Sequence, residues 1–388
     1  MKTIQTVCRR LSKVVVSLIV ITAGMAFNTD TPEVSPEQTA TTKDQTIMLA
    51  LLLDTSNSME GLIDQAKSQL WKIVNELAAA KTTNGSRPNI KIALYEYGND
   101  GLPASEGHIR QVSQFTHDFD VISEKLFALT TNGGNEFCGQ VIKTSLSQLA
   151  WSSSTADVKM IFIAGNEPFT QGEVSYRAAC SMAKEKNVIV NTIFCGNFSE
   201  GVESGWKTGA VITGGSYMSI EQNNRTVYIP TPYDEKIEGM NERLNSTYVY
   251  YGKAGSARKQ LQSIQDKNAE SYGLSNIVER TVCKGSHAYD NSSWDLVDAY
   301  KEDETIISKA KTEDLPAEMK GMTMEQRKAY VVQKTNERTS IQKEIQLLNR
   351  KRQEYILSHP SAESKDAMLD AAMLRTVREY AKTKNLTW

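Results

Sequence analysis

The sequence is poor in the residues on which many catalytic and metal sites depend. It holds four histidines and five cysteines in 388 residues, and no two cysteines form a C-x-x-C pair. Zinc sites of cysteine and histidine and thiol redox motifs are therefore not expected. The G-x-S-x-G turn of serine hydrolases is absent, and no Lys-Ser/Thr pair follows Gly133 and Gly134 as a P-loop requires.

A marked excess of charge of either sign is also missing. Lysine and arginine number 44, aspartate and glutamate 46, and the formal net charge is -2. Since no block of like charge stands out either, nucleic acid is not an expected partner. Hydrophobic residues make up 40% of the chain, which is enough for a sizeable core, and the length favours two structural units.

The N-terminus has the order of a secretory signal peptide. An apolar run at residues 14–23 is followed by Gly24 and Ala26, small residues that suit cleavage after Ala26. Four basic residues precede the run: Lys2, Arg9, Arg10 and Lys13. Residues 1–26 are therefore predicted to export the chain to the periplasm or cell surface. The alternative is an uncleaved N-terminal anchor, and no other segment is long and apolar enough to span a bilayer.

The cysteines beyond this leader are even in number. They are Cys138, Cys180, Cys195 and Cys283. An even count in an exported protein favours at least one disulfide, while the sequence leaves the pairing open and free buried thiols are the alternative.

The middle of the chain alternates between apolar runs and helical periodicity. Runs that suit buried strands occupy residues 47–53, 90–97, 158–164 and 188–194. Helical spacing marks residues 62–80, 119–129, 141–149 and 174–186. The alternation predicts an α/β domain over residues 46–229, with a central, mostly parallel sheet flanked by helices. Residues 27–45, rich in Thr, Pro, Glu and Gln, are predicted to be a linker.

The last part of the chain, residues 230–388, has a different character. Apolar strands disappear, and charged segments with helical spacing follow. Thr323 and Gln326 have the spacing of a helix-capping box, and Pro360 ends that helix. A C-terminal helical extension is therefore predicted, either packed on the first domain or forming a hairpin.

The motif that indicates chemistry follows the first predicted strand. Residues 54–58 read Asp-Thr-Ser-Asn-Ser, a D-x-S-x-S pattern that presents one carboxylate and the hydroxyls of Ser56 and Ser58. Such hard oxygen ligands suit Mg²⁺, Mn²⁺ or Ca²⁺ rather than zinc or copper. One carboxylate does not neutralise a divalent ion, so the site would accept a carboxylate from a partner. The alternative is an ordinary Asx/Ser turn that caps the next helix.

Several motifs, in the right order, make this region resemble the von Willebrand factor type A (VWA) domain, the fold of integrin I domains. Residues 130–136 stand where the family has its second metal loop, residues 190–196 resemble its fifth strand, and residues 213–217 resemble its T-G-G turn. The resemblance covers residues 46–229 and implies a Rossmann-like VWA fold with a metal-ion-dependent adhesion site (MIDAS). The whole chain is also similar to bacterial-envelope VWA proteins of uncharacterised activity.

The sequence departs from the family in two of the metal loops. The family usually has a Thr after the two glycines of its second loop, whereas here Asn135 and Glu136 follow and Thr131 precedes. The family's third motif reads Thr-Asp-Gly, whereas residues 164–168 read Ala-Gly-Asn-Glu-Pro. The residues predicted to surround the cation are therefore Asp54, Ser56, Ser58, Asn135, Glu136, Asn166 and Glu167.

The resemblance implies a binding protein rather than an enzyme. The expected partner is a protein or peptide held through Mg²⁺, with Mn²⁺ or Ca²⁺ as alternatives. A structural envelope scaffold with a vestigial metal site is one competing interpretation. A metal-assisted hydrolase is another, because Asp54, Glu136 and Glu167 are three carboxylates on one rim. A haloacid-dehalogenase-type phosphatase is not expected, since Ser56 stands where its second Asp is needed.

Export gives the first testable prediction. N-terminal sequencing of protein purified from its native source is expected to begin near Phe27, because the small residues before it suit signal peptidase. A sequence beginning at Met1 would contradict cleavage and favour the anchor.

Overall fold

The computed structural model describes residues 45–221, 228–359 and 369–388. The described residues form one compact unit. The predicted signal peptide, and the predicted linker up to residue 44, lie outside the described residues, as does Pro360. Among the described helices, none is long and apolar enough to cross a membrane.

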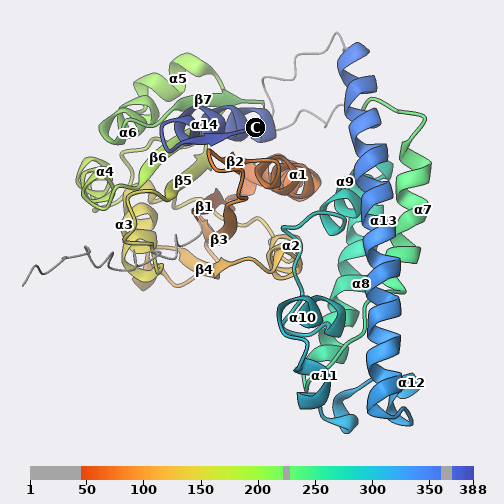
Figure 1. Ribbon diagram of the computed structural model, residues 1–388. Coiled ribbons are helices and arrows are strands. Elements are labelled where there is room, and N and C mark those ends of the chain that lie inside the picture. Colours follow the sequence, from red (N-terminus) through yellow and green to blue (C-terminus); the bar gives the residue numbers. More distant parts are fainter. Residues whose placement is uncertain (1–44, 222–227, 360–368) are drawn as a thin grey trace, which may run out of the picture. The chain divides into compact units, whose positions relative to one another are not determined.

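A six-stranded sheet forms the centre of the N-terminal part, in the order β4-β3-β1-β5-β6-β7 (Figure 1). β1 lies between β3 and β5, and all pairs are parallel except β3 with β4. The strands are β1 Thr46–Asp54, β3 Asn89–Tyr97, β4 Ile109–Thr116, β5 Val158–Gly165, β6 Ile189–Cys195 and β7 Tyr217–Ile220. β1 and β5 are buried along nearly their whole length, which explains their unbroken apolar runs. The predicted mostly parallel sheet is confirmed; the sequence does not predict β4, an edge strand whose residues are mostly polar and half-buried.

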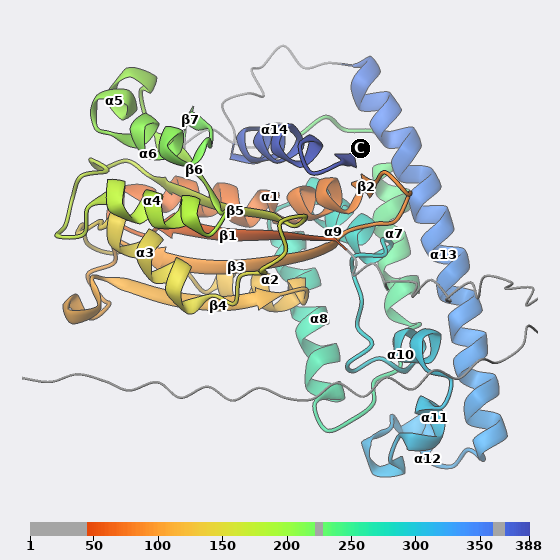
Figure 2. The same ribbon diagram turned by 60° about the vertical axis from the view of Figure 1, so that its left-hand side comes forward.

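Helices cover both faces of this sheet (Figure 2). One face packs against α1 Glu60–Ala78, α2 Phe119–Phe127 and α14 Leu369–Lys382. The other packs against α3 Cys138–Gln148, α4 Tyr176–Glu185 and α6 Trp206–Thr213, with the short α5 Phe198–Glu203 before α6. Short 3₁₀ turns η1 Asn57–Met59 and η2 Ala104–Glu106 precede α1 and β4. The predicted three-layer α/β architecture is confirmed.

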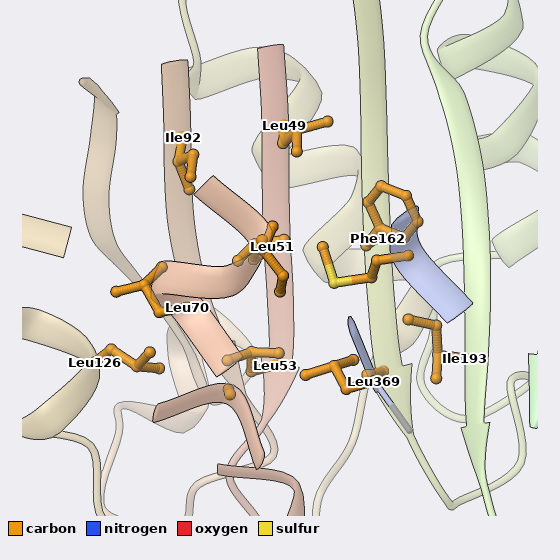
Figure 3. A pocket seen from close by; sticks show the side chains of 13 residues that line it. Leu49, Leu51, Leu53, Leu70, Ile92, Leu126, Phe162, Ile193 and Leu369 are labelled. Atoms are coloured by element: carbon orange, nitrogen blue, oxygen red, sulfur yellow. The ribbon is translucent and has the colours of Figure 1, made fainter. Parts of the chain in front are cut away.

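α14 brings the end of the chain back onto the sheet. Its Leu369 and Met373 line a small cavity with Leu51, Phe162 and Ile193 of the strands (Figure 3). The cavity has a volume of about 20 Å³ and every side chain around it is apolar, so it is a packing gap and not a ligand site. The chain then ends in β8 Leu386–Thr387, which pairs with β2 Lys81–Thr82 beyond α1.

The described part of the region between β7 and α14 consists of helices, the loops between them and the isolated bridge between Tyr250 and Asp295. α13 is its longest element and contacts α7 and α9 (Figure 1). The Thr323–Gln326 capping box is present at its start, with Thr323 N–H donating to Gln326 Oε1 at 2.8 Å. The elements are α7 Asp234–Asn245, α8 Gly255–Ser271, α9 Leu274–Lys284, α10 Leu296–Glu302, α11 Ile306–Lys309, η3 Thr312–Asp314, α12 Ala317–Lys320 and α13 Met324–Ser358.

Buried charges join this helical region to the α/β domain. Arg280 of α9 is fully buried and pairs with Asp120 of α2 at 2.7 Å and with Asp266 of α8 at 2.5 Å. Its guanidinium also lies over the ring of Trp71 in α1, 4.6 Å from the centroid. Burial alone would raise the pKa of Asp266, but Lys284 and Arg280 hold it well below its usual range.

The disulfide expected from the cysteine count is not found. Cys138, Cys180, Cys195 and Cys283 are all free and buried. The first two lie in the core beneath α3 and α4, and the other two lie in the core on the opposite face of the sheet. Burial raises the pKa of all four thiols, so they act as small apolar core residues. The prediction of a disulfide among them is wrong.

The buried junction gives the second prediction. Arg280→Ala leaves Asp120 and Asp266 without their shared cation, and it is expected to lower the free energy of unfolding by about 3–5 kcal/mol in urea denaturation. Arg378→Ala is the matched control, because Arg378 pairs with Glu76 at the surface and its loss is expected to cost about 0–1 kcal/mol. Equal losses for the two variants would contradict the role given to Arg280.

Candidate metal centre

The first loop of the candidate site follows the central strand β1. Asp54, its last residue, is 0% exposed. The backbone N–H of Ser56 donates to Asp54 Oδ1 at 2.8 Å, which turns the loop back over the strand end. The hydroxyls of Ser56 and Ser58 lie 3.1 Å apart. Asp54, Ser56 and Ser58 are thus brought together at one end of β1, as the D-x-S-x-S pattern predicts.

The second loop is tied to the first by backbone hydrogen bonds. Asn132 N–H donates to the carbonyl of Thr55 at 2.9 Å, and Asn57 N–H donates to the carbonyl of Gly133 at 3.1 Å. This pairing brings the side chain of Glu136, which is 3% exposed, against Asp54. A Cβ atom added to Gly98 would stand 2.7 Å from Glu136 Cγ and 2.8 Å from Asp54 Oδ1. Both side chains therefore lie against the backbone of Gly98.

Asn135 faces elsewhere. Its side-chain amide donates to Asp100 Oδ1 at 3.1 Å, on the loop after β3. Glu136 is therefore the residue of the second loop that approaches Asp54, while Asn135 holds the second loop to the loop of Asp100. The sequence left these two residues as alternatives, and the backbone course of the loop separates their roles.

The third loop, after β5, closes the other side. The side-chain amide of Asn166 lies 3.2 Å from the Ser58 hydroxyl. Glu167 accepts a hydrogen bond from the amide of Gln171 at 3.2 Å, and Gln171 Oε1 in turn accepts from Glu136 N–H at 3.2 Å. Gln171 thus links the second and third loops.

Burial and mutual repulsion act on the carboxyl groups of this cluster. Burial raises the pKa of Asp54 to about 6, against the opposing hydrogen bonds from Ser56. Burial and then the negative charge of Asp54 raise the pKa of Glu136 to about 8. Glu167 adds its own negative charge to both shifts, and no cationic side chain is among the main causes of either.

The residues present fit a hard divalent cation. In the part of the chain that the structure describes, Asp54 Oδ2 and Glu136 Oε2 are buried without a hydrogen-bond partner, and such oxygens cost free energy unless a proton or a cation meets them. Carboxylate, hydroxyl and amide oxygens are the donors that Mg²⁺, Mn²⁺ and Ca²⁺ prefer. The described residues contain no group of three His, Cys, Asp or Glu arranged for a metal, so the serine hydroxyls and Asn166 have to complete any such set.

Some residues around the site had no signal in the sequence. Gly98 has a φ of +77°, which favours glycine, and a Cβ there would collide with Asp54 and Glu136. A Cβ on Gly165 would stand 2.9 Å from Asp54 Oδ2 and 2.5 Å from the hydroxyl of Tyr97. Tyr97 donates to the carbonyl of Ala164 at 3.0 Å and so joins the ends of β3 and β5. These roles depend on contacts between neighbouring strands, which periodicity does not specify.

Comparison with known families gives a direct assignment for this part of the chain. Residues 49–202 match the family model described as the von Willebrand factor type A domain. The chain contains a VWA domain. The resemblance to the VWA domain is thereby confirmed over residues 49–202, which include the loops of Asp54, Glu136 and Glu167.

The chain is also similar to several solved structures. The SpRpn10 VWA domain is 17% identical, with 45% of this chain and 88% of that chain covered and a TM-score of 0.34. BatB from Bacteroides thetaiotaomicron is 15% identical, with 57% and 99% covered and a TM-score of 0.35. Proximal thread matrix protein 1 from the mussel byssus, in a structure with a zinc-occupied MIDAS motif, is 12% identical, with 45% and 42% covered and a TM-score of 0.33. No curated protein sequence matches the chain.

The raised pKa values give the third prediction. In the metal-free folded protein, the pKa values of Asp54 and Glu136 are about 6 and about 8. In the unfolded chain both carboxyl groups lose their protons near pH 4. The folded state therefore binds more protons between about pH 4 and 8, and its stability falls as pH rises through this window. Glu136→Gln removes one of the two groups, so its thermal midpoint in EDTA is expected to fall less between pH 5 and 8 than that of the wild type.

The control for this experiment is Glu185→Gln, which removes a carboxyl exposed at the end of α4. It is expected to follow the wild-type pH profile. A Glu136→Gln profile that coincides with both would contradict the buried carboxyl pair.

Proposed function

We propose that this is an exported binding protein whose VWA domain engages a protein partner through a divalent cation at Asp54, Ser56, Ser58 and Glu136. VWA domains commonly mediate protein–protein interaction, and residues 49–202 belong to such a domain. Mg²⁺ is the proposed ion, with Mn²⁺ and Ca²⁺ as alternatives of the same ligand preference.

One observation supports the metal above the others. Two carboxyl groups, of Asp54 and Glu136, are buried side by side with an unpartnered oxygen each, among described residues that bring no cation to them. Leaving both ionised without a cation would cost far more than a surface charge does. A bound cation would supply Lewis-acid attraction for an oxygen of the partner.

The chain's own residues determine how such a cation would be held. Asp54 and Glu136 provide charge, and Ser56 and Ser58 provide neutral oxygens on the same loop. Asn166 reaches Ser58 from the third loop and is the proposed neighbour there. Glu167 is the proposed outer neighbour, since Gln171 holds its carboxylate.

Export is part of the proposal and is supported by the N-terminal leader pattern alone. Binding, rather than catalysis, is proposed because residues 49–202 match the VWA family model and such domains commonly mediate protein–protein interaction.

The fourth prediction tests the metal directly. A ligand that binds only the folded state stabilises it by about 2.7 kcal/mol at a hundredfold excess over Kd, which corresponds to a rise in thermal midpoint of roughly 3–5 °C for a compact unit as large as this one. Millimolar Mg²⁺ or Mn²⁺ is expected to produce such a rise in the wild type and none in Asp54→Ala.

Glu185→Ala serves as the control and is expected to respond to the metal as the wild type does, because Glu185 is exposed on α4. If wild type and Asp54→Ala respond identically, the metal site is vestigial and the protein acts as a scaffold.

A further inference from the structure

Gln171 joins the second and third metal loops through the two ends of its side-chain amide. Its Oε1 accepts a hydrogen bond from the backbone N–H of Glu136 at 3.2 Å, and its Nε2 donates to Glu167 Oε2 at 3.2 Å. Because a backbone N–H can only donate, the amide oxygen has to face Glu136. The NH₂ group is therefore the end of the amide that faces the Glu167 carboxylate.

The turn that carries Gln171 fixes where this amide reaches. Gln171 N–H donates to the carbonyl of Pro168 at 3.0 Å, which closes a tight turn in the third loop. Gly172 follows with a φ of +84°, and a Cβ there would stand 2.7 Å from the ring of Phe137. The turn thus packs closely on the end of the second loop, and the amide of Gln171 is held between the two loops.

The backbone of Glu167 is fixed from the opposite side. Trp206 of α6 donates its indole N–H to the carbonyl of Glu167 at 2.8 Å, and Phe169 N–H donates to the carbonyl of Ser204 at 3.0 Å. Trp206 is fully buried and packs on Phe169, with their ring centroids 4.7 Å apart. The side chain is therefore the part of Glu167 whose direction depends on Gln171.

The Glu167 carboxylate lies within electrostatic range of the metal centre. Its negative charge contributes to the raised pKa values of both Asp54 and Glu136, while its Oε2 accepts the hydrogen bond from Gln171. Released from that hydrogen bond, the carboxylate would be a third charged ligand close to Asp54 and Glu136.

The number of carboxylates at such a site affects which divalent ion it prefers. Mg²⁺ requires nearly octahedral geometry, keeps several waters and is usually bound through about one or two carboxylates. Ca²⁺ takes roughly six to eight oxygen ligands, and its affinity depends on the number of charged ligands. Asp54 and Glu136 alone give a count that suits Mg²⁺, and the addition of Glu167 would favour Ca²⁺.

We propose that Gln171 determines the ion preference of the metal centre, because its amide keeps the Glu167 carboxylate from becoming a third ligand of the ion. Gln171 is a positioning residue, since it acts through Glu167 and through the backbone of Glu136. The inference rests on the proposed metal-dependent function, and it assigns a preference for Mg²⁺ over Ca²⁺ to one hydrogen bond within the third loop.

Calorimetric titration of the purified full chain with Mg²⁺ and with Ca²⁺ tests the proposal. Gln171→Ala is expected to weaken Mg²⁺ binding by about 10- to 100-fold, as is typical when an outer partner of a metal ligand is lost. Ca²⁺ binding is expected to stay equal or to tighten, because Glu167 becomes available. The ratio of the two dissociation constants therefore shifts toward Ca²⁺, and an unchanged ratio would overturn the proposal.

A double variant separates this role from a general loosening of the loops. In Gln171→Ala/Glu167→Gln no carboxylate is released, so the ratio is expected to stay within about twofold of that for Glu167→Gln alone. An equal shift of the ratio with and without the Glu167 carboxylate would overturn the proposal. Gln114→Ala is the matched control, because Gln114 is exposed on β4, and it is expected to leave the ratio unchanged.

Thermal midpoints in EDTA and in Mg²⁺ separate this inference from the proposed function. If Gln171→Ala does not fold in EDTA, Gln171→Met keeps the length of the side chain without either hydrogen bond and is expected to shift the ratio in the same direction. If Mg²⁺ stabilises the wild type and the ratio does not change in the variants, the metal site stands and the role of Gln171 fails. If neither ion binds the wild type, the proposed function itself fails.

Discussion

The constraint on which this structure depends is the burial of two carboxyl groups, Asp54 and Glu136, where the central strand β1 ends. Three loops contribute to the site. They are held together by the hydrogen bond from Asn132 N–H to the carbonyl of Thr55, by the contact of Asn166 with Ser58 and by the hydrogen bonds of Gln171. The glycines at 98 and 165 leave the space that the carboxyls occupy. Burial of a carboxylate without a counter-charge is unfavourable. Without a metal the two carboxyl groups therefore favour the protonated form, and a divalent cation would stabilise their ionised form.

The helical region serves the same domain by fixing its outer helices. Arg280 connects α9 to Asp120 of α2 and to the ring of Trp71 in α1. Arg338 of α13 pairs with Asp295 at 2.6 Å and lies over the ring of Tyr248, which anchors the long helix in the same way. These buried ion pairs fix how the helices are arranged more than they add to the free energy of unfolding. Separately, α14 completes the helical layer over one face of the sheet.

Much of the architecture could be predicted from the sequence because periodicity reports burial. The apolar runs of β1 and β5 and the capping box of Thr323 are local signals, and the structure has all of them. The edge strand β4 has no such signal, because its residues are mostly polar and half-buried beside β3. The return of α14 to the sheet depends on contacts distant in sequence. So does the choice of Glu136 over Asn135, which the hydrogen bonds of the loop decide. The disulfide predicted from the cysteine count is wrong for the same reason, because the count does not specify which cysteine side chains lie close together.

The central claim is that Asp54 and Glu136 hold one divalent cation between them. A crystal grown with Mn²⁺ and measured at a wavelength that reveals anomalous scattering tests it most directly. The account predicts one anomalous peak in coordinating contact with carboxyl oxygens of both Asp54 and Glu136 and with a hydroxyl of the Ser56–Ser58 pair. A map without such a peak, with the two carboxyl groups in direct hydrogen-bond contact, would contradict it.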